Sequence, residues 1–208
     1  MRGISVMALL LGITILPSGQ SAAQQQHVLV NPLQCEGPLS RDTDHATLVT
    51  TFGADNVLLD QDYVTRDDGT LSVSTLFPND NERELRIVWK DKRLQGISRI
   101  EIWGSAWSIG PGIRVGTTLL EVERLNGRPF RLAGFGWDGS GEAGVWERGK
   151  LARLLGGCHP VLYFDPGVET SFEDYQKVMG DDVHYSDSPA MRTVKPIVRS
   201  MTLAYELQ

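Results

Sequence analysis

Hydrophobic and polar residues alternate with a period of two along much of the chain, which is the pattern of β-strands that have one covered face. The alternation runs through 57–65, 70–77, 85–90, 98–103 and 197–207. The first two segments flank residues 66–69, where Asp68-Gly69 predicts a hairpin turn. Residues 161–164 are apolar at every position. That run and the long last segment therefore predict strands inside a sheet rather than at its edge.

Three short stretches have instead the period of an amphipathic helix, at 40–52, 118–126 and 171–179. Each follows a Ser, Thr or Asp that can cap a helix, and each ends at a glycine. The candidate caps are Ser40, Asp42 and Thr43, then Thr117 or Thr118, then Ser171 with Asp174; the glycines are Gly53, Gly127 and Gly180. We expect Phe172, Tyr175 and Met179 to form the inner stripe of the third helix. Short helices among neighbouring strands predict an α+β protein with an antiparallel sheet and three short helices.

Two further segments are expected to be extended. Pro129 begins a run in which Phe130, Leu132, Phe135 and Trp137 are predicted to face the core, with a bulge near residues 133–134. The glycine-rich connection 104–116 is expected to run over the surface, as connections between elements usually do.

The first 23 residues have the three-part layout of a secretory signal peptide. A basic start at Arg2 precedes an uncharged run, 4–17, that is rich in Leu, Ile and Met, and small residues at Ser21 and Ala23 suit a cleavage site. The apolar run is shorter than the roughly 20 residues of a membrane span. We therefore expect a signal peptide at 1–23, a periplasmic or secreted mature chain, and no transmembrane segment after cleavage.

Two cysteines, Cys35 and Cys158, follow the signal peptide. In an oxidising compartment such a pair predicts one disulfide, and closing so long a loop is worth roughly 5 kcal/mol in the chain-entropy model. The alternative is a reactive Cys158 thiol with His159 as its base, but adjacent residues rarely converge in this way. The residues before Cys35 are not those of a lipid-attachment site.

The composition is that of a globular protein, with 41% apolar and 22% charged residues. Residues 24–208 are expected to fold as a single compact α+β domain, or as two tandem helix-plus-sheet units at about 40–104 and 113–208. The three helix-glycine-strand steps fit either arrangement, because their spacing alone is weak evidence of duplication.

One segment, Ile113–Pro129, has the spacing I-x-x-G-x-T-x-x-E-V-x-x-x-x-G-x-P. This segment resembles small bacterial envelope proteins such as the small lipoprotein subunit of the outer-membrane β-barrel assembly machinery, whose fold the β-lactamase inhibitor proteins share. The resemblance implies two tandem helix-plus-sheet units and a periplasmic protein-binding or scaffolding role without catalysis. It carries over no functional residue, and the lipidated cysteine of the lipoproteins is absent at the signal junction.

Charge and motifs argue against several functions. A net charge of −6 disfavours nucleic acid as a partner. Residues 110–116 lack the Lys-Ser/Thr ending of a phosphate loop, and residues 139–141 do not form a serine nucleophile elbow. No histidine pair has the spacing of a metal site, so we expect no metal and no cofactor. The four histidines are His27, His45, His159 and His184.

Carboxylates occur in five close groups, which are Asp60/Asp62, Asp67/Asp68, Asp80/Glu82, Asp138/Glu142 and Asp181/Asp182. Acid–base catalysis would require two of them to converge in a cleft. Most are interpreted as solvated turn residues, where Asp bonds to the backbone. A periplasmic hydrolase that uses a carboxylate pair is nevertheless kept as the alternative to a binding protein.

Five tryptophans are many for a chain of this length. They either fill a β core or provide aromatic surface for a partner. Trp107 lies in the glycine-rich connection and Trp103 at the end of a predicted strand, so these two are the predicted binding residues. The sequence thus predicts a non-catalytic envelope protein whose partner is another envelope protein or a peptide.

Overall fold

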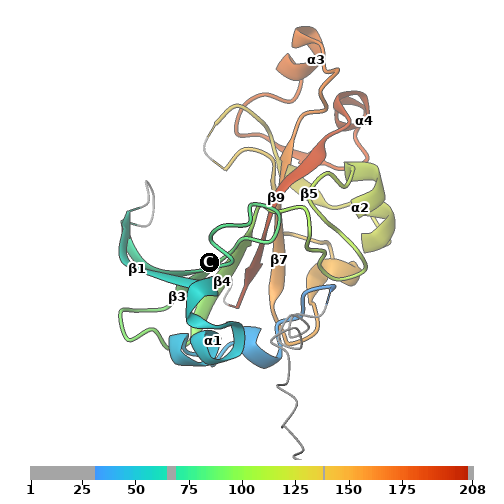
Figure 1. The fold of residues 1–208 in the computed structure, drawn as a ribbon. Helices are drawn as coiled ribbons and strands as arrows, with labels where there is room; N and C mark the ends of the chain where they lie inside the picture. Colours follow the sequence, from blue (N-terminus) through green and yellow to red (C-terminus); the bar gives the residue numbers. More distant parts are fainter. Residues whose placement is uncertain (1–30, 65–68, 138, 206–208) are drawn as a thin grey trace, which may run out of the picture.

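The computed structural model describes residues 31–64, 69–137 and 139–205 (Figure 1). The predicted signal peptide and the central residues of the predicted hairpin turn lie outside these ranges, as do Asp67, Asp68 and Asp138. Within the described residues, no helix is long and apolar enough to cross a membrane.

In the part of the chain that the structure describes, seven antiparallel strands form one sheet in the order β1-β2-β3-β4-β9-β7-β6, and two more form a small sheet, β5-β8. The strands are β1 Val57–Val64, β2 Thr70–Leu76, β3 Leu85–Trp89, β4 Ile97–Ile102, β5 Arg131–Ala133, β6 Glu142–Ala143, β7 His159–Asp165, β8 Val183–Tyr185 and β9 Ile197–Ala204. β9 lies between β4 and β7, and β7 lies between β9 and β6. Both strands predicted to be interior are therefore interior, and the predicted α+β class with an antiparallel sheet is confirmed.

The described ranges contain four α-helices, which are α1 His45–Phe52, α2 Leu119–Asn126, α3 Phe172–Gln176 and α4 Pro189–Val194. Short 3-10 turns occur at Gly37–Leu39, Ala54–Asn56 and Lys150–Ala152. In Figure 1, α1 lies beside the strands of the first half, whereas α2, α3 and α4 surround the second half.

One face of the sheet, here called the covered face, is packed against the helices and loops. In α1, Leu48 is fully buried. The Nδ1 atom of His45 lies 2.9 Å from the hydroxyl oxygen of Ser74 on β2. In the second half, the Phe130 ring packs 6.2 Å from that of Phe164 on β7 and 4.9 Å from that of Trp146. Leu48, Phe130, Trp146 and Phe164 belong to one continuous hydrophobic cluster that includes residues from every long strand.

The caps of two predicted helices are confirmed. Thr118 accepts a hydrogen bond from the Glu121 amide, and Gly127 ends α2 in the left-handed conformation that favours glycine. Ser171 caps α3 by accepting a hydrogen bond from the Asp174 amide. The cap of α1, however, is Asp44, so the predicted start at 40–43 is wrong.

The interior stripe predicted for the third helix is wrong at two of its three positions, whereas Tyr175 packs against the core as predicted. Phe172 is 74% exposed and Met179 is 50% exposed, whereas Val178 is fully buried. α3 ends at Gln176, after little more than one turn, so a helical period drawn out to residue 179 assigns the wrong side chains to the core. The fourth helix, α4, was not predicted; Ser188 caps it and Pro189 begins it, a combination typical of a helix start.

The extended run after Pro129 is only partly as predicted. Phe130, Leu132 and Phe135 are buried, but Trp137 is 44% exposed. The chain turns out of the sheet at Gly136, whose φ of 88° suits glycine, and this turn carries the next side chain outward.

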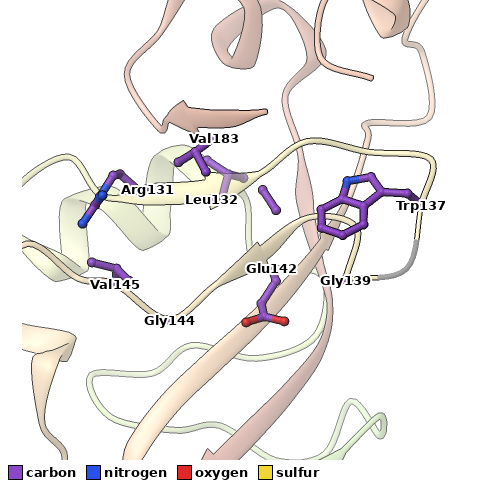
Figure 2. Close-up of a pocket in the computed structure, with 9 residues that line it drawn as sticks. Arg131, Leu132, Trp137, Gly139, Glu142, Gly144, Val145 and Val183 are labelled. Atoms are coloured by element: carbon purple, nitrogen blue, oxygen red, sulfur yellow. The ribbon is translucent and has the colours of Figure 1, made fainter. Parts of the chain in front are cut away.

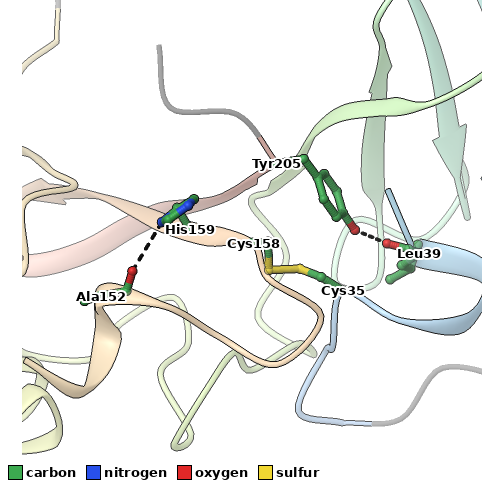
Figure 3. The surroundings of a disulfide bond; sticks show 6 residues. All are labelled: Cys35, Leu39, Ala152, Cys158, His159 and Tyr205. Atoms are coloured by element: carbon green, nitrogen blue, oxygen red, sulfur yellow. Dashed lines mark hydrogen bonds between the residues drawn. A yellow bond between two sulfur atoms is a disulfide. The ribbon is translucent and has the colours of Figure 1, made fainter. Parts of the chain in front are cut away.

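The predicted disulfide between Cys35 and Cys158 is confirmed, with Cα atoms 6.1 Å apart (Figure 3). It ties the N-terminal segment to the start of β7, and both cysteines are buried. Nearby, the Tyr205 hydroxyl donates a hydrogen bond to the Leu39 carbonyl. The Nδ1 atom of His159 lies 3.2 Å from the carbonyl oxygen of Ala152. Since both sulfurs are bonded to each other, the alternative of a reactive Cys158 thiol is excluded.

Candidate functional site

The second face of the sheet, here called the open face, has a different chemistry. Residues directly opposite one another in an antiparallel sheet share a face. The register pairs Thr75 with Arg86, Arg86 with Glu101, and Glu101 with Thr202, whose partner on β7 is Val161. Two residues further along β7, on the same face, Tyr163 pairs with Ser200 on β9 and with Glu142 on β6. Polar, charged and aromatic side chains thus lie on this face in every strand from β2 across to β6, in two rows rather than one.

A bulge in β1 brings an aromatic ring onto this face. Asp60 pairs with Val73 and Tyr63 pairs with Leu71, so β1 has one residue more than β2 between the two pairs. An extra residue reverses the alternation of side chains beyond it. Tyr63 consequently shares the open face with Leu71, Val73 and Arg86, where an unbroken strand would have placed Asp62.

Arg86 lies between two aromatic rings on the open face. Its guanidinium carbon is 4.7 Å from the centre of the Tyr63 ring and 4.5 Å from that of Trp103. Its Nη1 also donates a 2.8 Å hydrogen bond to the Tyr63 hydroxyl. Cation–π contacts of this kind hold an arginine in a defined orientation and are each worth about 0.5–1 kcal/mol at exposed sites. The three side chains form a rigid unit, which we call the aromatic–arginine cluster.

Carboxylates on the neighbouring strand complete the charge balance of the cluster. Glu101 lies 3.6 Å from Arg86 and accepts a 2.8 Å hydrogen bond from Nε of Arg99. The side chains of Glu101 and Arg99 are each 17% exposed, so both ends of this pair are largely shielded from water. Such pairs orient their members more than they stabilise the fold.

A second bulge places another arginine on the open face. β7 advances by one residue from Tyr163 to Phe164, while β9 advances by two, from Ser200 to Val198, which makes Arg199 the extra residue. Its guanidinium lies 5.9 Å from the centre of the Tyr163 ring and 3.4 Å from an Asp165 carboxylate oxygen. The bulge explains why this charge interrupts the otherwise apolar alternation of the last strand.

Tyr163 and Glu142 share a hydrogen bond at the β6 end of the face. Burial, followed by the nearby Glu142 carboxylate, raises the pKa of Tyr163 to about 12. Burial also raises the pKa of Glu142 above its ordinary value, although the hydrogen bond from Tyr163 opposes this shift. The phenol therefore remains a proton donor at neutral pH and holds the carboxylate in place.

A cavity of about 280 Å³ opens beside Glu142, between β5 and β6 (Figure 2). The two strands are joined at one end by the Arg131–Val145 bridge and at the other by a 3.0 Å bond from the Gly141 amide to the Gly134 carbonyl. Its walls are mainly apolar. The lining residues are Arg131, Leu132, Ala133, Trp137, Gly139, Glu142, Gly144, Val145 and Val183.

Several apolar side chains around this cavity face solvent. Trp137, Val145, Val183 and Tyr185 are between 44% and 63% exposed. Arg131, at the opposite end from Trp137 in Figure 2, is neutralised by a 2.5 Å ion pair with Glu147. Exposed aromatic and β-branched side chains around a concavity are typical of a contact surface.

The structure separates the two predicted binding residues. Trp103 is 45% exposed and belongs to the aromatic–arginine cluster. Trp107 is only 7% exposed, and its Nε1 donates a 2.8 Å hydrogen bond to the Arg83 carbonyl. The expectation that Trp107 is exposed on a surface connection is therefore wrong.

The connection from β4 to α2 is packed rather than superficial. Ile109 and Ile113 are fully buried, and the Ser108 carbonyl accepts a hydrogen bond from the Leu33 amide. A side chain at Gly104 would collide with the Glu82 carbonyl, so glycine allows the connection to approach the loop before β3. This close approach carries Trp107 into the core four residues after the exposed Trp103.

Sequence reasoning missed Tyr63, Arg86, Tyr163 and Arg199 as members of the site. For Arg86 the strand alternation was a usable signal, because it occupies a polar position between apolar ones. For Tyr163 it was not, because residues 161–164 are apolar at every position. For Tyr63 no such signal existed, because it reaches the open face only through a bulge. For Arg199 the signal was a charge that interrupts the apolar alternation of the last strand, but the bulge that causes it appears only in the strand pairing.

The candidate catalytic and metal-binding groups remain dispersed. Asp80 accepts hydrogen bonds from nearby backbone amides, as expected of a turn carboxylate, whereas Asp60 lies in β1 and accepts one from the Asp62 amide at the bulge. The ion pair with Arg83 lowers the pKa of Asp80. Over the described parts of the chain, no group of three or more His, Cys, Asp or Glu residues is placed to hold a metal ion.

No protein-family model matches the chain, and no curated protein is significantly similar to it. Among solved structures, the crystal structure of the uncharacterized protein yfeY from Escherichia coli aligns with a TM-score of 0.43 and 15% sequence identity. The alignment covers 79% of this chain and 90% of that chain. So distant a similarity indicates neither a shared family nor a shared function.

Proposed function

We propose that the mature protein is a non-catalytic binding protein of the cell envelope, and that it holds a partner protein or peptide on the open face. The disulfide supports a location in an oxidising compartment, because such bonds persist outside the reducing cytosol. The resemblance of Ile113–Pro129 to small envelope proteins favours the same kind of role.

The aromatic–arginine cluster is the observation that carries this proposal. Trp, Tyr and Arg are the residues most enriched at the energetic centres of protein interfaces. Here one of each is held in a fixed arrangement on a sheet, so little side-chain entropy would be lost when a partner binds. Trp103 keeps 45% of its surface available for burial by that partner.

The open face offers charges of both signs. Arg199 and Asp165 are 44% and 51% exposed, whereas Glu101 and Arg99 lie deeper. A partner segment with alternating charge and at least one apolar anchor would match this face, and the cavity beside Trp137 could accept such an anchor.

A hydrolase that uses a carboxylate pair is the alternative function. Glu142 is its best candidate, because burial raises its pKa. The hydrogen bond that this carboxylate receives comes from Tyr163, however, and a phenol with a pKa of about 12 makes a poor base at neutral pH. Because the partner of Glu142 is a phenol rather than a second carboxylate, a binding function is favoured over hydrolysis.

The test is capture of partners from envelope extract by the immobilised mature protein, with three variants in parallel. Trp103→Ala and Arg86→Ala should lose a captured protein that wild type retains. Phe172→Ala is the matched control, since its ring is 74% exposed but lies on α3. Melting temperatures of all variants show whether each is folded. Equal capture by wild type and folded Trp103→Ala and Arg86→Ala would overturn the proposal.

A further inference from the structure

A second cavity, of about 230 Å³, lies between the start of α2 and the end of α4. The segment before α2 is held against β9 by the Thr118–Ile197 bridge and by a 2.8 Å hydrogen bond from the Leu119 amide to the Pro196 carbonyl. The cavity is lined by apolar side chains and by two basic ones, without any acidic residue: Thr118, Leu119, Leu120, Met191, Arg192, Lys195 and Pro196.

Lys195 has an unusual backbone conformation at the rim of this cavity. It ends α4 with φ 49° and ψ 59°, in the left-handed region, and its amide bonds to the Met191 carbonyl. Glycine or asparagine is favoured at such a helix end, because other side chains are strained there. Lys195 is exposed and has no ion-pair partner within the described ranges, so its ammonium group is available to a ligand at the rim.

Arg192 adds a second basic group to the lining. Its Nη2 donates a 2.5 Å hydrogen bond to Glu123, while its Nη1 is buried and has no partner among the described residues. The first turn of α2 borders the same cavity, and the positive end of a helix dipole also favours an anion. Glu123 compensates the charge of Arg192, so what this side chain adds is the unpartnered Nη1 donor. That donor, the ammonium group of Lys195 and the first turn of α2 together favour an acceptor of negative charge at this site.

The remaining walls favour an apolar ligand body. Leu119 and Met191 are buried, and Leu120 at the cavity is 61% exposed. The volume is below the roughly 300–1,000 Å³ typical of sites for drug-sized ligands, so the cavity suits a short chain.

From this combination we propose that the cavity binds a small aliphatic carboxylate. Lys195 would pair with the carboxylate, and the chain would lie against Leu119, Leu120 and Met191. This site is separate from the open face and does not depend on the function proposed for that face.

The experiment is calorimetric titration of the mature protein with octanoate, with octanol and octylamine as neutral and cationic ligands of equal chain length. Octanoate should bind saturably at one site, and octanol and octylamine should bind at least tenfold more weakly. Lys195→Gly should reduce octanoate affinity at least tenfold and, because glycine tolerates the left-handed conformation, should also raise the melting temperature.

Arg148→Gly is the matched control. Arg148 is also a basic residue at positive φ, 62°, but it does not line the cavity. This variant should likewise gain stability while its octanoate affinity stays within twofold of wild type. Lys195→Gln, which keeps most of the side chain but removes the charge, should lose affinity as Lys195→Gly does.

Three results would overturn the proposal. The first is no saturable binding of octanoate, and the second is equal affinity for octanoate and octylamine. The third is unchanged octanoate affinity in both Lys195 variants. If a peptide that ends in a leucine carboxylate binds but octanoate does not, the cavity recognises a chain terminus, and the assignment to a small acid is wrong.

Discussion

The two faces of the seven-stranded sheet are built from the same strands but carry different side chains. On the covered face, Ile87, Ile100 and Leu203 are fully buried. On the open face, positions one residue away hold Arg86, Glu101 and Thr202. Since the backbone is shared, the difference lies in the side chains: Arg86 and Glu101 carry charge and are 20% and 17% exposed, although Thr202 beside them is buried.

Trp103 and Trp107 show the same contrast within five residues of chain. Trp107 is enclosed and its indole N–H is bonded to a carbonyl, whereas Trp103 stacks on Arg86 and remains 45% exposed. An exposed tryptophan that is fixed in place suggests selection for contact, because the fold itself gains little from its free surface. The predictions below test this contrast.

Removal of the disulfide should have the largest effect on stability. Replacing both Cys35 and Cys158 with serine releases a loop whose ends are 123 residues apart in sequence, which the chain-entropy model values at roughly 5 kcal/mol. We expect the unfolding midpoint in urea to fall accordingly, with partner capture intact at temperatures where the variant is folded. Two free thiols in the denatured, unreduced wild type would contradict the premise.

Trp107→Ala should be nearly as damaging, because it empties a site in the core. Truncation of a buried aromatic costs about 3–5 kcal/mol, and the Arg83 carbonyl also loses its donor. Chemical denaturation measures the loss. A cost below about 1 kcal/mol would mean that this ring is not packed inside, and that the contrast with Trp103 is not real.

Trp103→Ala should cost only about 1 kcal/mol in stability, since it removes a partly exposed ring and one cation–π contact. Its effect on partner capture should be much larger than its effect on the melting temperature. A loss of stability equal to that of Trp107→Ala would assign Trp103 to the fold instead of the interface.

Tyr63→Phe should have a smaller effect, because it deletes one hydrogen bond to Arg86 and keeps the ring. Net contributions of such bonds are about 0.5–1.5 kcal/mol. Denaturant unfolding gives the stability change, and capture should weaken in parallel if the orientation of Arg86 matters. Unchanged capture would mean that the orientation of Arg86 does not affect binding, and that Trp103 is the contact residue of the cluster.

Glu142→Gln should have the smallest effect, and one that depends on pH. The raised pKa of Glu142 means that the folded state binds this proton more tightly than the unfolded state does. The protonated Glu142 side chain thus favours the folded state at low pH. This contribution to stability is lost as the pH rises from about 4.3, the ordinary glutamate pKa, through the raised pKa of the folded state. The variant should melt slightly higher than wild type at pH 7 and equally at pH 3.5; the reverse order at pH 7 would contradict the assigned shift.

The regular parts of the fold were predictable because they obey local rules. Alternation identified β2, β3, β4 and β9, and side-chain caps identified α2. Two cysteines after a predicted signal peptide were sufficient to predict the disulfide.

The open-face site was harder to predict because it depends on departures from those rules. The bulges that expose Tyr63 and Arg199 arise from how two strands pair, which neither strand shows by itself. Trp107 was misplaced for a similar reason: its burial follows from contact between the Gly104 connection and the distant Glu82. The exposed Phe172 shows that a helical period is unreliable when the helix is about one turn long.

The most direct test of the open face as a binding surface is site-specific photo-cross-linking. A photoreactive phenylalanine analogue at Leu58, which is 58% exposed and lies opposite Thr75 on the open face, would be compared with the same analogue at Phe172 on α3. In envelope extract, a discrete cross-linked product from position 58 but not from position 172 is predicted. Cross-linking from position 172 alone, or equal labelling of the same protein from both positions, would contradict the assignment of binding to the open face.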